Sequence, residues 1–383
     1  MIMKKRIMNI FIALAAVLIC SMGCQGKVFA ADTAETPKEQ FLYQYNSKGI
    51  ELTKYQGKEA VINIPEEIGG VKVTAIGTEC FYKNINLTKL TMPDTVVSIG
   101  ERAFSGCTAL EEIALSDNLK SIGKWAFASC KIKSVNMPDT LTFLGESAFA
   151  LCNSLEEAVC SEGLTELNGT FQSCHNLKSV HLPSAPQFTK IGKSTFVGCS
   201  LKKIKIPASV TEIGEYAFGS GLMKLTFQKD SKLKKINNYA FAGCDLAKIT
   251  LPASLEEMGN KIFDGCDRLK KIYFEENAKL KEFPSGAFGD CNALREVDIP
   301  ENITELNPKL FIGCYYLRKV HIKGGSIQRI AKNTFNGRMT NGVITVPKQY
   351  KKKYTKMLKK LKWYKDTIKI EAEKMFNYGE KGL

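Results

Sequence analysis

The chain contains few of the residues on which catalytic and metal chemistry usually depends. It has three histidines and two tryptophans among 383 residues. It has no HExxH, GxSxG or GxGxxG run, so it lacks the local patterns of the common metal, hydrolase and nucleotide sites. Its 13 cysteines are scattered, and no two form a CxxC pair, which removes the spacing typical of zinc and dithiol redox sites. We therefore expect no enzyme activity, no catalytic residue, no cofactor and no metal.

Long hydrophobic runs are also scarce. One apolar run, residues 7–20, follows the basic residues 4–6, and its length of about 14 residues is short of the ~20 that span a bilayer. With small and medium residues ahead of Ala31, the pattern predicts a secretory signal peptide over residues 1–30. Cys24 leaves a lipoprotein alternative open, although the residue three positions before it is a serine. We expect no transmembrane span in the mature chain.

A repeat of about 23 residues organises most of the remaining chain. Twelve of the 21 phenylalanines recur at intervals of 22 to 25 residues. They are Phe81, Phe104, Phe127, Phe149, Phe171, Phe196, Phe218, Phe241, Phe263, Phe288, Phe311 and Phe335. One such unit cannot bury its own apolar face, but stacked units can. The period predicts a solenoid of about 12 coils with a buried ladder of phenylalanine rings.

Each unit also contains a strand pattern and a turn pattern. The strand pattern is represented by Leu201, Ile204 and Ile206, has the spacing of a leucine-rich repeat, and is often closed by a proline such as Pro207. A second apolar pair follows, and then glycine or asparagine in ten coils. These residues are Gly77, Gly100, Gly123, Gly145, Asn168, Gly192, Gly214, Asn237, Gly259 and Asn307. Because both residue types tolerate a positive φ, we expect a shared left-handed corner there.

These units resemble the BspA-type leucine-rich repeat family. The family unit reads approximately apolar-x-apolar-Pro, followed by apolar-x-x-Ile-Gly-x-x-Ala-Phe-x-x-Cys, and segments 92–110 and 206–222 follow it closely. The resemblance covers about residues 41–370. It implies an α/β, strand-rich, right-handed solenoid with a parallel sheet on one face. It also implies a secreted or surface-exposed bacterial protein that binds other macromolecules, as the family's adhesins do, and it brings no catalytic residue.

Nine cysteines follow the same period. Each lies three residues after a repeat phenylalanine: Cys107, Cys130, Cys152, Cys174, Cys199, Cys244, Cys266, Cys291 and Cys314. A spacing set by the coil favours small buried residues that pack between coils. Disulfides between neighbouring coils stay open as an alternative, because stacked Cα atoms about 5 Å apart are within bridging distance.

The strands also predict a binding face. One position in each strand faces solvent between two buried residues, and two positions earlier four successive coils have lysine. The candidate ligand-binding residues are Lys203, Lys205, Lys224, Lys248, Lys271, Tyr273 and His321. Like charges stacked at about 4.8 Å repel one another, so the lysine row has no stabilising reason. One hypothesis is that the row binds an anionic partner; the other is that it is an ordinary solvated lysine face, because lysine is common on all surfaces.

The C-terminal segment concentrates the charge. The chain has 54 basic and 39 acidic residues, and residues 348–383 alone hold 12 lysines against four acidic residues. Tyr350, Tyr354 and Leu358 follow helical spacing among these lysines, which predicts an amphipathic basic helix. The helix is expected either to cap the last coil or to attach the protein to an anionic surface.

The expected organisation is a signal peptide at 1–30, a lead-in at 31–54, a repeat array at 55–342 and a basic cap at 343–383. The expected function is that of an exported, adhesin-like, monomeric protein that binds a protein or an anionic polymer on a host or bacterial surface. The alternative is a wall-associated scaffold held by its basic C-terminal segment. Nucleic acid is not expected as a partner, because the basic stripe lacks stacking aromatic residues.

Overall fold

The computed structural model describes residues 35–335, 339, 341–361 and 368–372. The predicted signal peptide, Cys24 and the last part of the basic segment lie outside the described residues.

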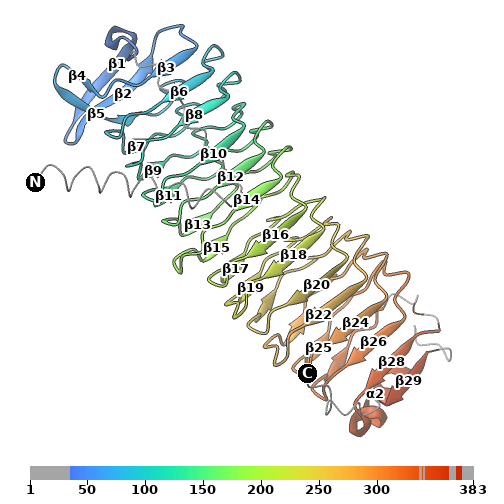
Figure 1. Ribbon diagram of the computed structural model, residues 1–383. Helices are drawn as coiled ribbons and strands as arrows, with labels where there is room; N and C mark the ends of the chain where they lie inside the picture. The colour runs from blue at the N-terminus through green and yellow to red at the C-terminus, as the bar shows by residue number, and fades with distance from the viewer. Residues whose placement is uncertain (1–34, 336–338, 340, 362–367, 373–383) are drawn as a thin grey trace, which may run out of the picture. The chain divides into compact units, whose positions relative to one another are not determined.

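A row of parallel strands runs through successive coils (Figure 1). Its members are β3 (Val61–Asn63), β6 (Lys89–Thr91), β8 (Glu112–Ala114), β10 (Ser134–Asn136), β12 (Glu157–Val159), β14 (Ser179–His181), β16 (Lys203–Ile206), β18 (Lys224–Phe227), β20 (Lys248–Leu251), β22 (Lys271–Phe274), β24 (Glu296–Ile299), β26 (Lys319–Ile322), β28 (Val343–Val346) and β29 (Lys369–Ala372). Hydrogen bonds join them into sheets of three, three, two and six strands. Apolar residues alternate with exposed ones, as in β16, because successive side chains point to opposite faces.

A second row of shorter parallel strands forms where the second apolar pair occurs. Its members are β7 (Ser98–Ile99), β9 (Ser121–Ile122), β11 (Phe143–Leu144), β13 (Glu166–Leu167), β15 (Lys190–Ile191), β17 (Glu212–Ile213), β19 (Lys235–Ile236), β21 (Glu257–Met258), β23 (Glu282–Phe283), β25 (Glu305–Leu306) and β27 (Arg329–Ile330). The stack has about 14 turns and few helices. The predicted strand-rich solenoid is confirmed, and the second row adds strands that the sequence pattern did not predict.

The repeat phenylalanines lie in the turn between the second-row strand and the next first-row strand. All twelve are buried, and each ring stacks on the next; the Phe104 and Phe127 centroids are 5.0 Å apart with the planes inclined by 2°. The backbone N–H of Phe104 donates to the Ala126 carbonyl of the following coil at 2.7 Å. The turns are therefore hydrogen-bonded from coil to coil, as the strands are.

The predicted left-handed corner at Gly100, Gly214 and their equivalents is wrong. Positive φ values occur instead two residues before the repeat phenylalanine, as at Arg102 (51°) and Tyr216 (50°). The glycines serve a close approach between coils. A Cβ added at Gly214 would lie 2.4 Å from the carbonyl carbon of Gly192 in the preceding coil, a distance that no side chain can accept.

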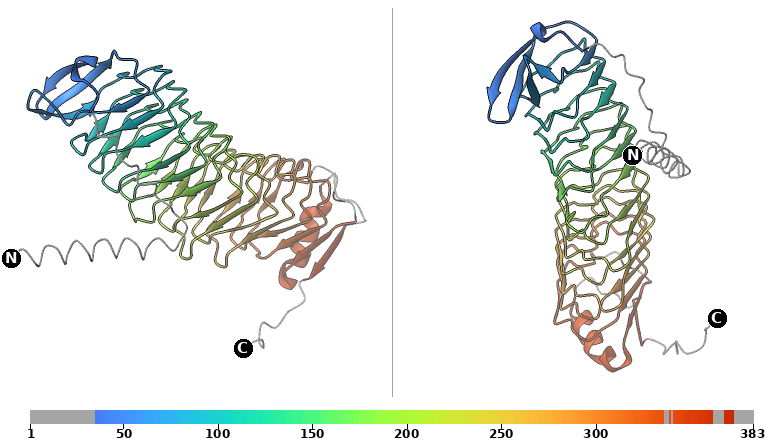
Figure 2. Two further views of the ribbon diagram at one scale, coloured as in Figure 1. Left: turned by 45° about the horizontal axis from the view of Figure 1, so that its top comes forward. Right: turned by 60° about the vertical axis from the view of Figure 1, so that its left-hand side comes forward.

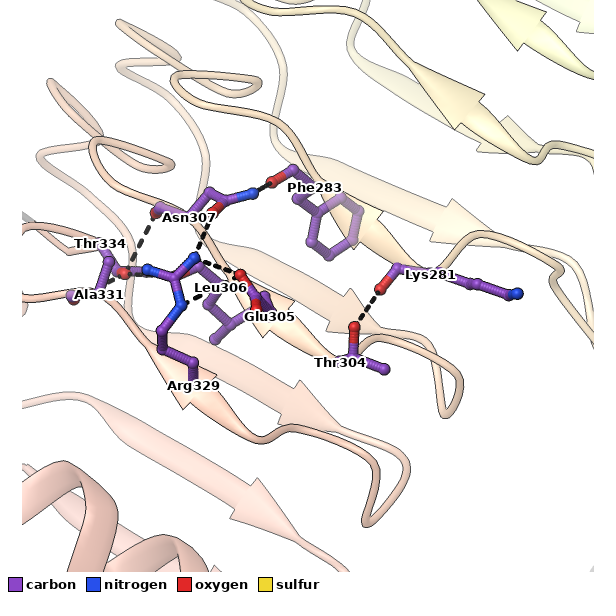
Figure 3. A network of polar contacts seen from close by, with 9 residues as sticks. All are labelled: Lys281, Phe283, Thr304, Glu305, Leu306, Asn307, Arg329, Ala331 and Thr334. Atoms are coloured by element: carbon purple, nitrogen blue, oxygen red, sulfur yellow. Dashed lines mark hydrogen bonds and ion pairs between the residues drawn. The ribbon is translucent and has the colours of Figure 1, made fainter.

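Asparagine fills the same corner by bonding across the coils. The Asn307 side-chain amide donates to the Phe283 carbonyl at 2.9 Å, and Arg329 donates to its Oδ1 at 3.2 Å while pairing with Glu305 (Figure 3). Asn237 donates to the Ile213 carbonyl at 3.1 Å. These asparagines link neighbouring coils through their side chains. Their occurrence at this position is therefore explained by hydrogen bonds between coils and not by a left-handed backbone.

The eleven cysteines of the described residues are all buried and unbridged. The Cys152 thiol donates to the Phe127 carbonyl of the preceding coil at 3.1 Å, and eight further cysteines make the same kind of bond. Loss of solvation raises the pKa of Cys174 to about 12. Because the thiolate is the reactive form, this shift makes Cys174 a poor nucleophile.

Different elements lie near the two ends of the described chain. Near the N-terminus, the 3-10 helix η1 (Lys38–Gln40) precedes an antiparallel hairpin of β1 (Phe41–Asn46) and β2 (Gly49–Tyr55). β4 (Glu67–Ile68) pairs with β5 (Val71–Ile76), which joins this hairpin to β7. Near the C-terminus, η2 (Lys348–Tyr350) leads into α2 (Lys351–Lys359), and β29 pairs with β28 (Figure 2).

Candidate functional site

Side chains on the outward face of the first strand row do not pack in the core. Asn136, His181 and Lys205 are exposed, and each lies between two less exposed residues of its coil. The strand period of two fixes this arrangement, because the residues on either side of each exposed position point inward. Packing therefore does not restrict which residue types occupy these exposed positions, and those residues determine what the face can bind.

A shallow groove on this face is lined by basic side chains. It has a volume of about 410 Å³ and lies over β14, β16 and β18. Its basic residues are Lys178, His181, Lys203, Lys205 and Lys224. Within the described part of the chain, no acidic residue lines this groove.

Among the described residues, the basic groove has acidic neighbours beside Lys178 and His181 but none within ion-pair distance of Lys203, Lys205 and Lys224. Lys178 lies 3.1 Å from Glu156, and His181 lies 3.5 Å from Glu157. Lys203, Lys205 and Lys224 form no ion pair with any described residue. Unpaired like charges held side by side create a positive potential that attracts anions.

The strand register explains why these lysines lie together. Lys203 is directly opposite Lys224, and Lys205 is opposite Thr226. The pairing repeats one sheet further on, where Lys248 is opposite Lys271. Lys203, Lys224 and Lys248 are exposed, so their ammonium groups can meet a partner.

Lys271 belongs to a different environment, and the expectation that the lysine row has no stabilising partner is wrong for it. Its Nζ lies 2.9 Å from Glu296 and 6.0 Å from the Tyr273 ring centroid. The hydrogen bond to Glu296 raises the pKa of Lys271. Glu296 occupies in β24 the position that lysine holds in β22, so the row of lysines ends in an ion pair.

A second cluster of chemically active side chains surrounds this ion pair. Glu296, Asp298 and His321 each offer one ligand atom, and these atoms lie within 4.8 Å of one another. His321 Nε2 is 3.4 Å from Glu296 Oε1, and Lys323 lies 2.8 Å from Asp298. Partial burial, the largest single effect, raises the pKa of Glu296, but Lys271 together with His321 and Lys319 lowers it below its usual value.

The structure therefore divides six of the seven predicted ligand residues between two places, and Lys248 lies outside both, on β20 opposite Lys271. Lys203, Lys205 and Lys224 line the basic groove, whereas Lys271, Tyr273 and His321 lie around Glu296. Reasoning from the sequence did not single out Glu296 or Asp298 as ligands, because it compared the histidines only with each other. The strand pattern does place Asp298 at an outward position of the coil before His321, and the two residues are directly opposite in the sheet.

The C-terminal helix presents apolar and basic sides. Tyr354 and Leu358 of α2 are buried, while Lys352, Lys356 and Lys359 are exposed. The Tyr354 hydroxyl donates to the Gly324 carbonyl at 2.8 Å, which ties the helix to the preceding coils. Among the described residues, no helix has the length and apolar character that crossing a membrane requires.

The chain is similar to known leucine-rich repeat proteins. The family model described as BspA type leucine rich repeat region matches residues 74–170, 168–232 and 219–341. A solved leucine rich cell surface protein from Faecalibacterium prausnitzii is 29% identical, with 80% of this chain and 92% of that chain covered and a TM-score of 0.50. A leucine-rich repeat protein from Bacteroides ovatus is 23% identical, with 91% and 100% covered and a TM-score of 0.51. The comparison with curated proteins found no match.

Proposed function

Because the chain belongs to the BspA-type leucine-rich repeat family, we propose that it is an exported, non-enzymatic protein that binds another macromolecule at or outside the bacterial surface. The similarity to a cell surface protein of F. prausnitzii supports this location, as does the predicted signal peptide. Burial of the described cysteines supports a role without covalent chemistry, because it leaves their thiols without access to a substrate.

The observation that carries the proposal is the basic groove. Three lysines without acidic partners among the described residues line it, on strands whose spacing is fixed by the sheet. A rigid row of ammonium groups favours a partner with several negative charges, either an acidic protein segment or an anionic polymer.

Charge reversal in the groove tests the proposal. The triple substitution Lys203→Glu, Lys205→Glu and Lys224→Glu should weaken binding at least about tenfold, which is ~1.4 kcal/mol, because it turns attraction into repulsion. Binding is measured by biolayer interferometry on poly-L-glutamate, heparin and purified wall fractions. Poly-L-glutamate is the probe for an acidic protein segment, and the other two report an anionic polymer.

A matched control changes the same number of charges elsewhere. Lys232, Lys234 and Lys281 are exposed residues outside the groove, and the corresponding triple glutamate variant has the same net charge as the groove variant. Equal loss of binding in both variants would show that net charge, not the groove, attracts the partner. Undiminished binding by the groove variant would contradict the proposal.

The exposed lysines of α2 support a second candidate function, a scaffold held at the cell wall by charge. Lys352→Gln, Lys356→Gln and Lys359→Gln remove charge from the outward side of the helix and leave Tyr354 and Leu358 in place. The scaffold function predicts that this variant folds normally but is released from cells at lower salt. Retention equal to that of the unsubstituted protein would exclude it.

A further inference from the structure

Three side chains of the first strand row form a cluster that the proposed binding function does not use. Glu296 and Asp298 are two residues apart on β24, so both point to the same face. His321 lies on β26 directly opposite Asp298, in a register of four consecutive residue pairs. The backbone of two paired strands therefore fixes the origins of all three side chains.

The donor set is one that binds divalent transition metals. An imidazole nitrogen and two carboxylate oxygens are common ligands of Zn²⁺, and sites with three protein ligands take water in the fourth position. Tetrahedral bonds of about 2.0–2.1 Å bring ligand atoms roughly 3.3 Å apart. His321 Nε2 and Glu296 Oε1 are already 3.4 Å apart, and all three ligand atoms lie within 4.8 Å.

Two lysines compete for the same carboxylates. Lys271 approaches Oε2 of Glu296 at 2.9 Å, and Lys323 approaches Oδ2 of Asp298 at 2.8 Å. Each lysine engages one oxygen, so the second oxygen of each carboxylate remains available to a cation. The lysines should weaken cation binding by mutual repulsion, and removing one should strengthen it.

The same chain contains an incomplete copy of this arrangement. His181 on β14 lies 3.5 Å from Glu157, in the register that relates His321 to Glu296. The residue opposite His181 is Val159, where the other cluster has Asp298. The two places therefore differ by one ligand.

We propose that Glu296, Asp298 and His321 form a binding site for a divalent transition-metal ion such as Zn²⁺. The site is separate from the basic groove, and its existence does not depend on the proposed function. Water completes the coordination, and the half site at Glu157 and His181 lacks the third ligand that Asp298 supplies.

Titration of the full chain with Zn²⁺ tests the assignment. Isothermal titration and elemental analysis of dialysed protein should give about one equivalent of Zn²⁺ per chain. Asp298→Asn keeps the size of the side chain but removes the anionic ligand, and His321→Ala removes the imidazole. Both variants should lose the bound Zn²⁺ while keeping the circular dichroism spectrum and melting temperature of the metal-free protein.

Two gain-of-binding variants distinguish a metal site from a simple charge cluster. Val159→Asp should supply the missing ligand beside His181 and raise the stoichiometry to about two. Lys323→Gln should tighten binding at the first site, whereas a purely structural ion-pair cluster would only lose stability. A second equivalent in Val159→Asp and tighter binding in Lys323→Gln support the proposal.

Cobalt provides a check on the ligand type. Co²⁺ bound by oxygen and nitrogen shows weak visible bands, whereas thiolate ligands add strong charge-transfer absorption in the near ultraviolet. Charge-transfer bands would locate the metal at cysteines and overturn the assignment. Absence of Zn²⁺ binding, or one equivalent retained in both Asp298→Asn and His321→Ala, would overturn it as well.

Discussion

At the scale of single residues, the phenylalanine ladder makes each ring depend on its two neighbours. Phe218 stacks on Phe196 and Phe241 with centroid distances of 5.5 Å on both sides. The neighbouring rings are fixed by their own coils, so they cannot move into a space left by a missing ring. Dense interiors that cannot relax are the ones in which large-to-small substitutions cost most.

Phe218→Ala should therefore lower the free energy of unfolding by about 3–5 kcal/mol. Thermal and chemical denaturation followed by circular dichroism measure the change. Phe143→Ala is the matched control, because this ring is 59% exposed on β11 and its loss should cost less than about 1 kcal/mol. Equal stability of the two variants would show that the ladder does not support the stack.

At the scale of the structural element, the corner glycines set how closely coils approach. The Cβ that alanine would add at Gly214 meets the Gly192 carbonyl carbon at 2.4 Å and the Lys193 nitrogen at 2.5 Å. Both obstacles are backbone atoms, which are held by the hydrogen bond from the Gly214 N–H to the Ile191 carbonyl. The space between coils, rather than a special φ, is the constraint at this position.

Gly214→Ala should destabilise the protein by about 1–3 kcal/mol, the usual cost of overpacking. Gly265 is the contrasting position, since its φ is +70° and an added Cβ would meet nothing within 4 Å. Gly265→Asn should cost less than about 1 kcal/mol, because asparagine tolerates the left-handed region. Denaturant midpoints compare the two variants, and a Gly214→Ala protein as stable as the unsubstituted one would contradict the close-approach explanation.

The sequence predicts the solenoid fold correctly but not the role of the repeat glycines. The periods of phenylalanine and of the apolar strand residues predict the solenoid, because a core-facing position must be apolar in every coil. A glycine in a repeat, however, has two physical explanations, positive φ and close approach, and only the positions of neighbouring coils distinguish them.

The candidate site was predictable to a similar extent. The lysine row is visible in the sequence, but the partners of its members come from adjacent coils. Lys271 pairs with Glu296, and Asp298 faces His321, across 23 to 25 residues of chain. Such partners become neighbours only when the strand register is known, which is why the sequence grouped Lys271 and His321 with the groove lysines.

At the scale of the whole molecule, the stack is held together by contacts between successive coils. Each strand of the first row bonds to the strands before and after it within its sheet, and each repeat ring stacks on its own two neighbours. In such an array stability is approximately a sum of local terms, and the terminal coils need a cover for their apolar edge. We expect α2, with its buried Tyr354 and Leu358, and β29, which pairs with β28, to provide that cover after the last coils.

Deletion of residues 348–383 should therefore loosen the array from one end. Amide hydrogen exchange measured by mass spectrometry should rise in β28, which loses its hydrogen bonds to β29, and in β26, the next strand of the sheet. Exchange should stay unchanged in β6 to β12. Lys352→Gln, which removes charge from the exposed side of α2, should leave exchange unchanged throughout and serves as the control. Faster exchange along the entire chain would show that the segment stabilises all coils together, and no change in β26 and β28 would show that it does not act as a cap.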